Sequence, residues 1–425
     1  MRYIPEPNWR ADCIISLSER QSVGVQYWPQ ELLETSVSCT KLEKCSSIVF
    51  PISILHFASR LFVQWQTKEY SDLVTLLNGN LSGEHHYVEI LPEYWPLEPG
   101  TNFEVAHDKK PDGHIEHTIG IPKKVLVKAF LTAKNIFFAS LYDVEANKSE
   151  LMASSMIMLL FDPEHLTAAN TRKRIILTYR GAPNLLHNLG HELWLTKFFL
   201  MSRLKRHNKS PTLWSHREWL FRTFKDQIMR KEGYLMEPEE FNMHEISVLV
   251  FTSAEHHPRN YYAWDYLRWW VGEYAAEFGF PPGTYQKITA GGSEQDTKKQ
   301  KEDILLGLVQ GWCMNHHADI SGWAFYLWLL HRPHYSGEEG SLVKGYVGAH
   351  VLQFAARLGY RNESTWAFLR EIARMSVGSE PMMGFVSQYL QAMLDFREKD
   401  KEGERFGERE IERHREWCQP SQQGG

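Results

Sequence analysis

A short pattern at the start of a helix recurs five times in this sequence. Each copy places an apolar or aromatic residue a few positions into the helix, and a second bulky residue and often an arginine follow. The copies are centred on Ala169, Trp214, Trp264, Trp323 and Trp366, which are 45, 50, 59 and 43 residues apart. A period of this size is typical of stacked pairs of helices. The pattern therefore predicts an all-α fold, an α-solenoid of stacked helical hairpins.

Three of the copies also carry residues that favour the start of a helix. Ser210 precedes Pro211, and Asn260 and Asn362 hold the equivalent position in later copies. Such residues accept hydrogen bonds from the free N–H groups of a first helical turn, and proline is tolerated directly after them. Acidic residues lie 19, 19 and 20 residues before three of the centres, which predicts a preceding helix of nearly constant length. These residues are Glu150, Glu245 and Asp303.

Three of the central tryptophans are followed five residues later by a second one, at Trp219, Trp269 and Trp328. Five residues turn an α-helix by roughly 140°, so both flanks of this helix carry an aromatic ring. Such a helix is expected to lie between neighbours, as the inner member of a solenoid pair does. The chain has 15 tryptophans, too many to leave exposed, and we expect most of them to pack between layers.

Composition and charge exclude several classes of protein. The 425 residues carry a net charge of −5, so the composition does not indicate the excess of positive charge that nucleic-acid-binding proteins carry. The most apolar stretch, around Met156–Phe161, is too short to cross a bilayer, and no secretory signal is visible. The five cysteines are odd in number and form no C-x-x-C pair, which favours reduced thiols. We therefore expect a cytoplasmic protein without membrane insertion.

The pattern divides the chain into three parts. For residues 1–120 the sequence predicts an irregular N-terminal extension of short helices and loops, with a small strand near Tyr87–Leu91. Residues 121–395 carry the helical repeats, in which the Gly-, Lys- and Gln-rich stretch Ala290–Asp303 predicts a disordered insertion. Residues 396–425 form a charged C-terminal tail, in which Arg397–Arg415 predicts a solvated helix.

The residues of the copies resemble those of a known family. Residues 214–220 read Trp-Ser-His-Arg-Glu-Trp-Leu and resemble the W-x-H-R-x-W-L signature of protein prenyltransferase alpha-subunit repeats. Residues 259–264 read Arg-Asn-Tyr-Tyr-Ala-Trp and are similar to the (K/R)-N-Y-x-A-W opening of the repeat that faces the active site in that family. Residues 162–168 and 362–366 resemble the first and a later repeat, so the copies follow the family order.

This resemblance implies both a fold and a function. The implied fold is a crescent of helical hairpins that wraps a separate beta subunit. The beta subunit, an α/α barrel, would hold zinc, the isoprenoid and most of the catalytic site, so this chain itself would bind no metal or cofactor. The implied reaction transfers a geranylgeranyl or farnesyl group from an isoprenoid diphosphate, bound at the subunit interface, to the C-terminal cysteine of a protein substrate. The chain would then be a non-autonomous subunit of a transferase.

Three departures from the family pattern keep a second hypothesis open. Ala169 replaces a tryptophan, Arg268 lies four rather than three residues after Trp264, and Ser321-Gly322 stands where the family often has Asn-Tyr. Together with the long insertion before the fourth copy, they favour a helical-repeat adaptor that kept the fold and lost the catalytic partnership. An unrelated TPR-like scaffold fits less well, because its period of about 34 residues is shorter than any step here. The HEAT period overlaps, but the W-x-H-R-x-W pattern does not belong to it.

The resemblance also implies site residues. Arg259 holds the position of a family lysine that contacts the departing diphosphate, and Arg can bind phosphate oxygens in a bidentate manner. Tyr261, which we predict as a catalytic residue, holds a family tyrosine position whose phenol could donate to the same group. The alternative is a solvated Arg259 and a Tyr261 that packs between repeats. Lys209 has the equivalent position in the second copy and by repeat order should not face the site. We expect His216 and Arg217 to make hydrogen bonds between layers rather than to catalyse.

The histidines give no metal-binding pattern. His114 and His117 flank a carboxylate, but they lie in a predicted loop and lack a third ligand at helical spacing. The adjacent pairs at 85–86, 256–257 and 316–317 point their side chains apart on any helix or strand. We therefore predict no metal site in this chain.

Overall fold

The structure is a computed structural model, and it describes residues 66–79, 85–109, 115–229, 238–275, 294–375, 383–399 and 401–418. The chain separates into two units, Met1–Arg60 and Leu61–Gly425, and every described residue belongs to the second unit. The sequence predictions for residues 1–65 lie outside the described residues. No helix in the described ranges is long and apolar enough to cross a membrane.

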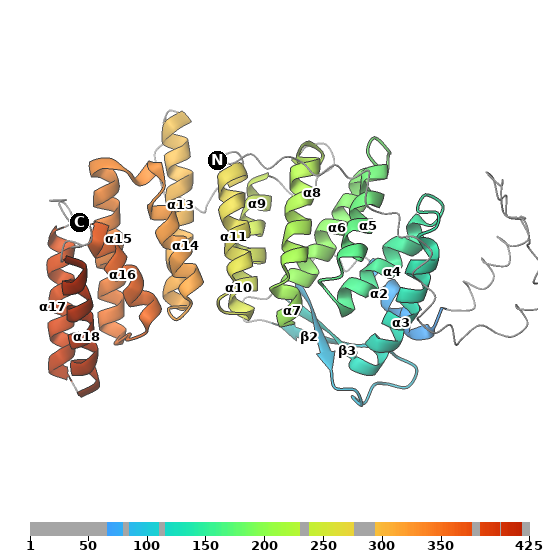
Figure 1. The fold of residues 1–425 in the computed structure, drawn as a ribbon, viewed down its shortest axis with the longest axis horizontal. Coiled ribbons are helices and arrows are strands. Elements are labelled where there is room, and N and C mark those ends of the chain that lie inside the picture. Colours follow the sequence, from blue (N-terminus) through green and yellow to red (C-terminus); the bar gives the residue numbers. More distant parts are fainter. Residues whose placement is uncertain are drawn as a thin grey trace, which may run out of the picture. The chain divides into compact units, whose positions relative to one another are not determined.

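A small sheet precedes the repeats. After α2 (Lys68–Asn78), the strands β1 (His85–Leu91), β2 (Glu104–Lys109) and β3 (Ile115–Pro122) form a sheet in the order β1-β3-β2. β1 runs parallel to β3, and β2 runs antiparallel to it. The strand predicted near Tyr87–Leu91 is present as β1. β2 and β3, which Figure 1 labels, were not predicted.

Buried apolar residues attach this sheet to the helices. Val88 on β1 and Ile119 on β3 are fully buried, and β3 leads directly into α3. The Ser202 hydroxyl, just after α6, donates a hydrogen bond to the carbonyl oxygen of Val88 at 3.3 Å. The residues before the first repeat are therefore part of the same core as the helices.

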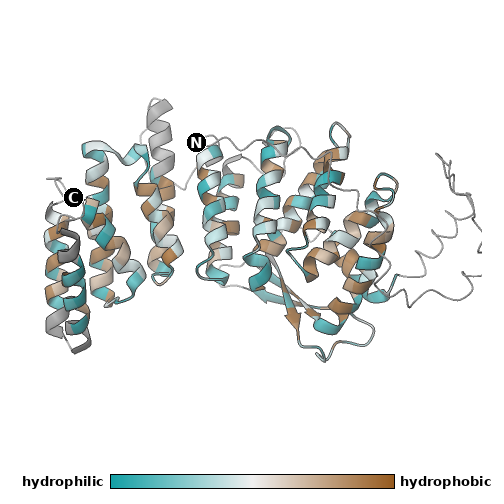
Figure 2. Cartoon of the chain, viewed as in Figure 1, coloured by the Kyte–Doolittle hydropathy of each residue, from teal (hydrophilic) through white to brown (hydrophobic). Residues whose placement is uncertain are grey.

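From Lys123 onward the described chain is helical. Its elements are α3 (Lys123–Ser140), α4 (Lys148–Phe161), α5 (Leu166–Thr178), α6 (Leu185–Leu200), α7 (Lys205–Asn208), α8 (Pro211–Met229), α9 (Pro238–Met243), the π-helix η3 (His244–Phe251), α10 (Thr252–His256), α11 (Tyr261–Trp270), the π-helix η4 (Val271–Ala275), α13 (Glu294–Asn315), α14 (Ile320–Leu330), the 3-10 turn η5 (Pro333–Tyr335), α15 (Gly337–Leu358), α16 (Glu363–Met375), α17 (Met383–Lys399) and α18 (Lys401–Cys418). The longer of these helices carry both hydrophobic and hydrophilic residues (Figure 2).

Among the described residues, the five copies of the sequence pattern each correspond to one pair of packed helices. The pairs are α4 with α5, α6 with α8, η3 and α10 with α11, α13 with α14, and α15 with α16. The second helices also pack side by side in chain order, as α5, α8, α11, α14 and α16 (Figure 1). The predicted all-α fold of stacked helical hairpins is therefore confirmed.

In four of the five copies the same position caps the second helix. Four residues before the centre, Ser210 and Asn260 accept hydrogen bonds from the amides of Leu213 and Ala263, at 3.1 and 3.4 Å. His165 and Asp319 do the same for α5 and α14. Each cap satisfies one of the N–H groups that a first turn leaves free.

The central residues of the copies anchor the layers. Trp214, Trp264, Trp323 and Trp366 are at most 3% exposed, as the sequence predicted. Ala169, which replaces the expected tryptophan of the first copy, is buried at the same place. The copies are thus equivalent in structure even where the central side chain differs.

Two segments differ from their sequence predictions. The insertion predicted to be disordered at Ala290–Asp303 is helical from Glu294, as the start of α13, because its Gln, Lys and Glu residues are good helix formers. The charged C-terminal segment forms α18, but α18 is not solvated on all sides. Phe406 packs edge-on against Trp366 at 5.3 Å, and Glu410 is buried beside Arg370.

Candidate functional site

The two predicted site residues lie at the exposed start of α11. Asn260 is fully buried and caps the helix, so the residues on either side of it are fixed relative to the repeat. Arg259 is exposed, and Tyr261 and Tyr262 are 54% and 44% exposed. Large aromatic side chains are seldom left this exposed side by side, so this turn presents a cation and two phenols to a ligand or partner.

The structure brings Lys209 to this turn, although the sequence prediction set it apart. Its ammonium donates hydrogen bonds to the carbonyl oxygens of Pro258 and Arg259, at 2.7 and 3.2 Å. Partial burial lowers the pKa of Lys209, and the nearby Lys205 and Arg259 cations lower it further against the opposing effect of Asp319. The spacing of the repeats could have indicated this contact, because Lys209 and Arg259 are both five residues before a central tryptophan.

A carboxylate from the fourth repeat holds the same turn from the other side. The Arg259 amide donates to Asp319 Oδ2 at 2.9 Å, while Asp319 Oδ1 caps α14 through the Ser321 amide at 2.8 Å. The start of α11 is therefore connected by side chains to both neighbouring repeats.

His216 and Arg217 are buried between the layers, as the sequence predicted. The Arg217 guanidinium pairs with Glu245, and its Nη1 donates to the Leu193 carbonyl oxygen and to Thr196 Oγ1, both at 2.8 Å. His216 Nε2 lies 2.9 Å from Glu192 Oε1, and burial is the main reason that the pKa of His216 is lowered. Neither side chain reaches the surface, so both act in packing.

A row of tryptophans and cations on the second helices was not predicted. Trp219, Trp269 and Trp328 are half-buried at equivalent positions of α8, α11 and α14. A cation lies over each ring. The distance from the cation to the ring centroid is 5.5 Å for Lys173 over Trp219, 5.0 Å for Arg222 over Trp269 and 6.0 Å for Arg268 over Trp328. We call these six residues the tryptophan–cation row. The five-residue tryptophan spacing marked these positions, but it predicted that both flanks of the helix would be enclosed.

Tryptophan and arginine together are the side chains most enriched at protein interfaces. The row lies on the layer of second helices that also carries Tyr261 at the start of α11. Its side chains recur at the same position of successive helices, so the exposed face repeats as the fold does. This face is suited to a second protein that contacts several repeats at once.

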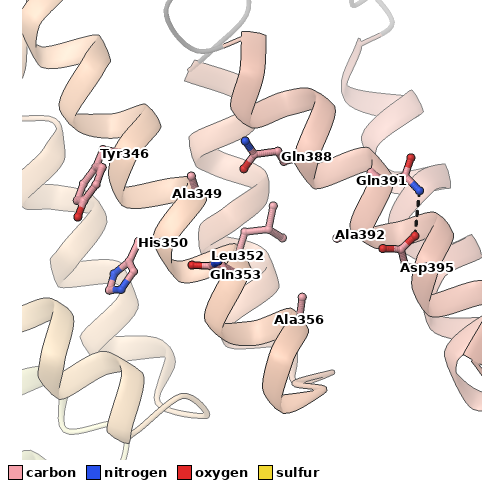
Figure 3. A pocket seen from close by; sticks show the side chains of 10 residues that line it. All are labelled: Tyr346, Ala349, His350, Leu352, Gln353, Ala356, Gln388, Gln391, Ala392 and Asp395. Atoms are coloured by element: carbon pink, nitrogen blue, oxygen red, sulfur yellow. Dashed lines mark hydrogen bonds between the residues drawn. The ribbon is translucent and has the colours of Figure 1, made fainter.

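A hollow of about 480 Å³ lies between α15 and α17 (Figure 3). Its walls are alanines, glutamines and a few larger side chains, among them Tyr346, His350 and Asp395. The Asp395 carboxylate accepts a hydrogen bond from the Gln391 amide at 2.9 Å, and His350 pairs with Gln310. No residue of the α11 turn lines the hollow, so it is separate from the candidate site.

No set of three or more His, Cys, Asp or Glu side chains within the described ranges could hold a metal ion. His107 and His117 face each other across β2 and β3 with their Nδ1 atoms 2.6 Å apart. His114, the partner of His117 in the sequence pattern, lies outside the described residues.

Comparison with known proteins supports the family resemblance. A model of the protein prenyltransferase alpha subunit repeat matches residues 248–274, which contain Arg259 and Tyr261. A human protein, protein prenyltransferase alpha subunit repeat-containing protein 1, is 28% identical over 192 residues. The match covers 43% of this chain and 40% of the human protein, so less than half of either is compared. One stretch of this chain is therefore similar to the protein prenyltransferase alpha subunit repeat, and the helical pairs of the described residues follow the order that the resemblance implied.

Proposed function

We propose that this chain is the alpha-type subunit of a heterodimeric protein prenyltransferase of the cytoplasm. The observation that carries the proposal is the start of α11, where Arg259 and Tyr261 are exposed within the repeat that the family model matches. The beta subunit would supply zinc, the isoprenoid site and most of the catalytic groups. This chain would contribute the exposed cation and phenol at the edge of the shared site.

The proposed chemistry requires positive charge at that edge. The thiol of a C-terminal cysteine of the protein substrate loses its proton to solvent, and the thiolate sulfur bonds to C1 of the geranylgeranyl or farnesyl group. The bond between C1 and the diphosphate oxygen breaks, and the diphosphate leaves with the electron pair. Because negative charge grows on the diphosphate in the transition state, fixed donors next to it lower the barrier. Arg259 would contact the diphosphate as a bidentate donor, and Tyr261 would donate from its phenol.

The tryptophan–cation row supports the partner part of the proposal. In this arrangement the beta subunit would cover the parts of Trp219, Trp269 and Trp328 that the chain itself does not bury. Charge reversal on the row, as Arg222→Glu with Arg268→Glu, is expected to weaken capture of a beta subunit at least tenfold, since interface arginines often dominate binding energy. Arg357→Glu at the exposed end of α15 is the matched control and should bind as the unaltered chain does.

The test of the catalytic role is turnover after reconstitution with a prenyltransferase beta subunit. The chain alone should transfer no prenyl group. Arg259→Ala with Tyr261→Phe should lower turnover by about 100-fold or more, as loss of transition-state donors does. Arg357→Ala with Tyr346→Phe is a control at another exposed Arg and Tyr. Failure to bind any beta subunit would reject the proposal.

The adaptor hypothesis is favoured by one feature of the fourth repeat. In the first turn of its second helix, α14, Ser321 and Gly322 are buried and stand where the family often has Asn-Tyr. An adaptor would bind a beta subunit or another protein through the row, but the Arg259 and Tyr261 variants would leave turnover unchanged. The same reconstituted complex therefore distinguishes the two functions.

A further inference from the structure

The turn before α11 is built differently from the equivalent turns of other repeats. In the second, fourth and fifth repeats, the central indole N–H donates to the carbonyl six residues earlier, at 2.8, 2.9 and 2.7 Å. The equivalent carbonyl in the third repeat belongs to Pro258, and it accepts from Lys209 instead. Within the described residues, buried Trp264 Nε1 is left without a hydrogen-bond partner. The third repeat has thus exchanged an internal hydrogen bond for one to its neighbour.

The same turn carries a strained backbone. Arg259 has φ of 61°, and among the described residues it is the only one other than glycine with positive φ. The left-handed region is unfavourable for a residue with a Cβ, and such a conformation persists only where the surroundings enforce it. Both backbone polar groups of Arg259 are held, the carbonyl by Lys209 at 3.2 Å and the amide by Asp319 at 2.9 Å.

The contacts come from three consecutive repeats. Lys209 precedes α8, Arg259 precedes α11, and Asp319 precedes α14. Asn208 Oδ1, next to Lys209, also accepts a hydrogen bond from the side-chain Nδ2 of Asn260 at 2.5 Å. The conformation of Arg259 therefore depends on the stacking of its neighbours and not on its own helix. The positive charges of Lys209 and Arg259 repel each other, so electrostatic attraction between the two side chains does not explain why they lie close together.

From this geometry we infer that Lys209 is a positioning residue, which holds Arg259 in the left-handed conformation and so directs its guanidinium away from the helix. The inference rests on the proposed function for its catalytic consequence. A cation that is already fixed loses less entropy when it binds a diphosphate, and the binding is correspondingly tighter. Lys209 would act through Arg259 and would not itself contact the diphosphate.

The first experiment needs no partner and measures backbone hydrogen exchange in the 257–264 segment of the isolated chain. Lys209→Met removes the two donated hydrogen bonds and keeps the length of the side chain. Exchange at the Arg259 and Asn260 amides should become about tenfold faster, the change that about 1.4 kcal/mol produces. Lys205→Met removes the neighbouring cation on α7 and should leave exchange unchanged. Equal exchange in the Lys209→Met variant and the original chain would overturn the inference.

The second experiment uses the reconstituted heterodimer and a double-mutant cycle. Lys209→Met should raise KM for the isoprenoid diphosphate about tenfold. Lys209→Arg should keep KM close to that of the unaltered heterodimer, because an arginine can donate to both carbonyls. In an Arg259→Gly background, Lys209→Met should cause no further loss, since no guanidinium remains to be directed. Additive losses would instead make Lys209 a direct ligand and overturn its positioning role. If no heterodimer forms, the proposed function fails while the exchange measurement still decides the role of Lys209.

Discussion

The first two junctions between repeats are polar, whereas the third is aromatic. Arg172 and Arg217, each three residues after the centre of its copy, pair with Glu192 and Glu245 on the first helix of the next repeat. All four side chains are at most 2% exposed. In both junctions the guanidinium also reaches back to a carbonyl and a hydroxyl of the preceding helix. One arginine therefore ties three helices together.

The third junction has no such arginine. Leu267 stands at the equivalent position, and Arg268 follows it on the half-exposed side of α11. The interior is filled instead by Trp264 and Trp312, whose ring centroids are 4.9 Å apart, and by the close approach of Gly322. The difference teaches that the same fold tolerates two kinds of junction. A buried ion pair requires one register because any other leaves a charge unpaired, while the aromatic junction depends on shape.

The largest expected effect comes from breaking a polar junction. Arg217→Met should lower the free energy of unfolding by about 3–5 kcal/mol, because Glu245 would remain buried without its cation. Burial opposes ionisation of Glu245, but Arg217 outweighs it and holds the pKa of this carboxyl below its usual range. Urea unfolding monitored by tryptophan fluorescence measures the loss. Arg217→Met with Glu245→Leu should recover much of it, and a double variant as unstable as the single one would contradict this account.

A second prediction concerns pH at the junction between the first two repeats. His207 Nε2 contacts the carbonyl oxygens of Leu159 and Leu160 at 3.1 and 2.9 Å, and burial lowers the pKa of His207 to about 4. An unfolded histidine has a pKa of about 6.5, so the unfolded chain takes up a proton before the folded chain does. Stability should fall as the pH drops from about 6.5 to about 4, by up to roughly 3 kcal/mol from this residue.

The measurement is urea unfolding at several pH values for the original chain and for His207→Gln. Glutamine can donate to the same carbonyls but has no proton to gain in this range. The difference between the two stability curves should slope across pH 4–6.5 and flatten above it. Parallel curves would show that His207 does not contribute, whatever the other buried histidines do.

The sequence predicted those parts of the fold that depend on local pattern. The buried tryptophan centres, the Ser210 and Asn260 caps and the first strand follow from spacing and residue type alone. β2 and β3 could not be predicted in this way. β2 is almost wholly exposed and reads Glu-Val-Ala-His-Asp-Lys, so it lacks the alternation that marks a half-buried strand.

The candidate site was predicted only in part. A solvated Arg259 was one of the two alternatives for that residue, and Arg259 is exposed. Tyr261 is also exposed, so it does not pack between repeats as its alternative stated. The catalytic role of both residues stays a prediction. The contact with Lys209 and the left-handed φ of Arg259 depend on how three repeats stack, which no single helix encodes. The move of one arginine from the Leu267 position to Arg268 was visible in the sequence, but its consequence, an aromatic junction, required the structure.

A third prediction tests the shape of the aromatic junction. A Cβ on Gly322 would lie 2.5 Å from Trp312 Cζ3 and 3.2 Å from Trp264 Cζ2, so Gly322→Ala forces the rings apart. We expect a loss of about 1–3 kcal/mol in the free energy of unfolding. Gly190→Ala is the matched control, because Gly190 is exposed within α6 and nothing lies within 4 Å of its Cβ position. Gly190→Ala should raise the free energy of unfolding by about 0.5–1 kcal/mol, because alanine has a higher helix propensity than glycine.

The smallest effect is expected for the displaced arginine itself. Arg268 pairs with Asp265 at 2.5 Å and lies 5.7 Å from the Phe325 ring, but it is half-exposed and Asp265 is exposed. Arg268→Leu should therefore change the free energy of unfolding by less than about 1 kcal/mol, because solvent screens an exposed pair and leaves no buried charge behind. Unfolding of this variant beside Arg217→Met, at low and high salt, compares the two arginines directly. A loss for Arg268→Leu as large as that for Arg217→Met would mean that Arg268 supports the third junction from outside, and that the junctions differ less than their interiors indicate.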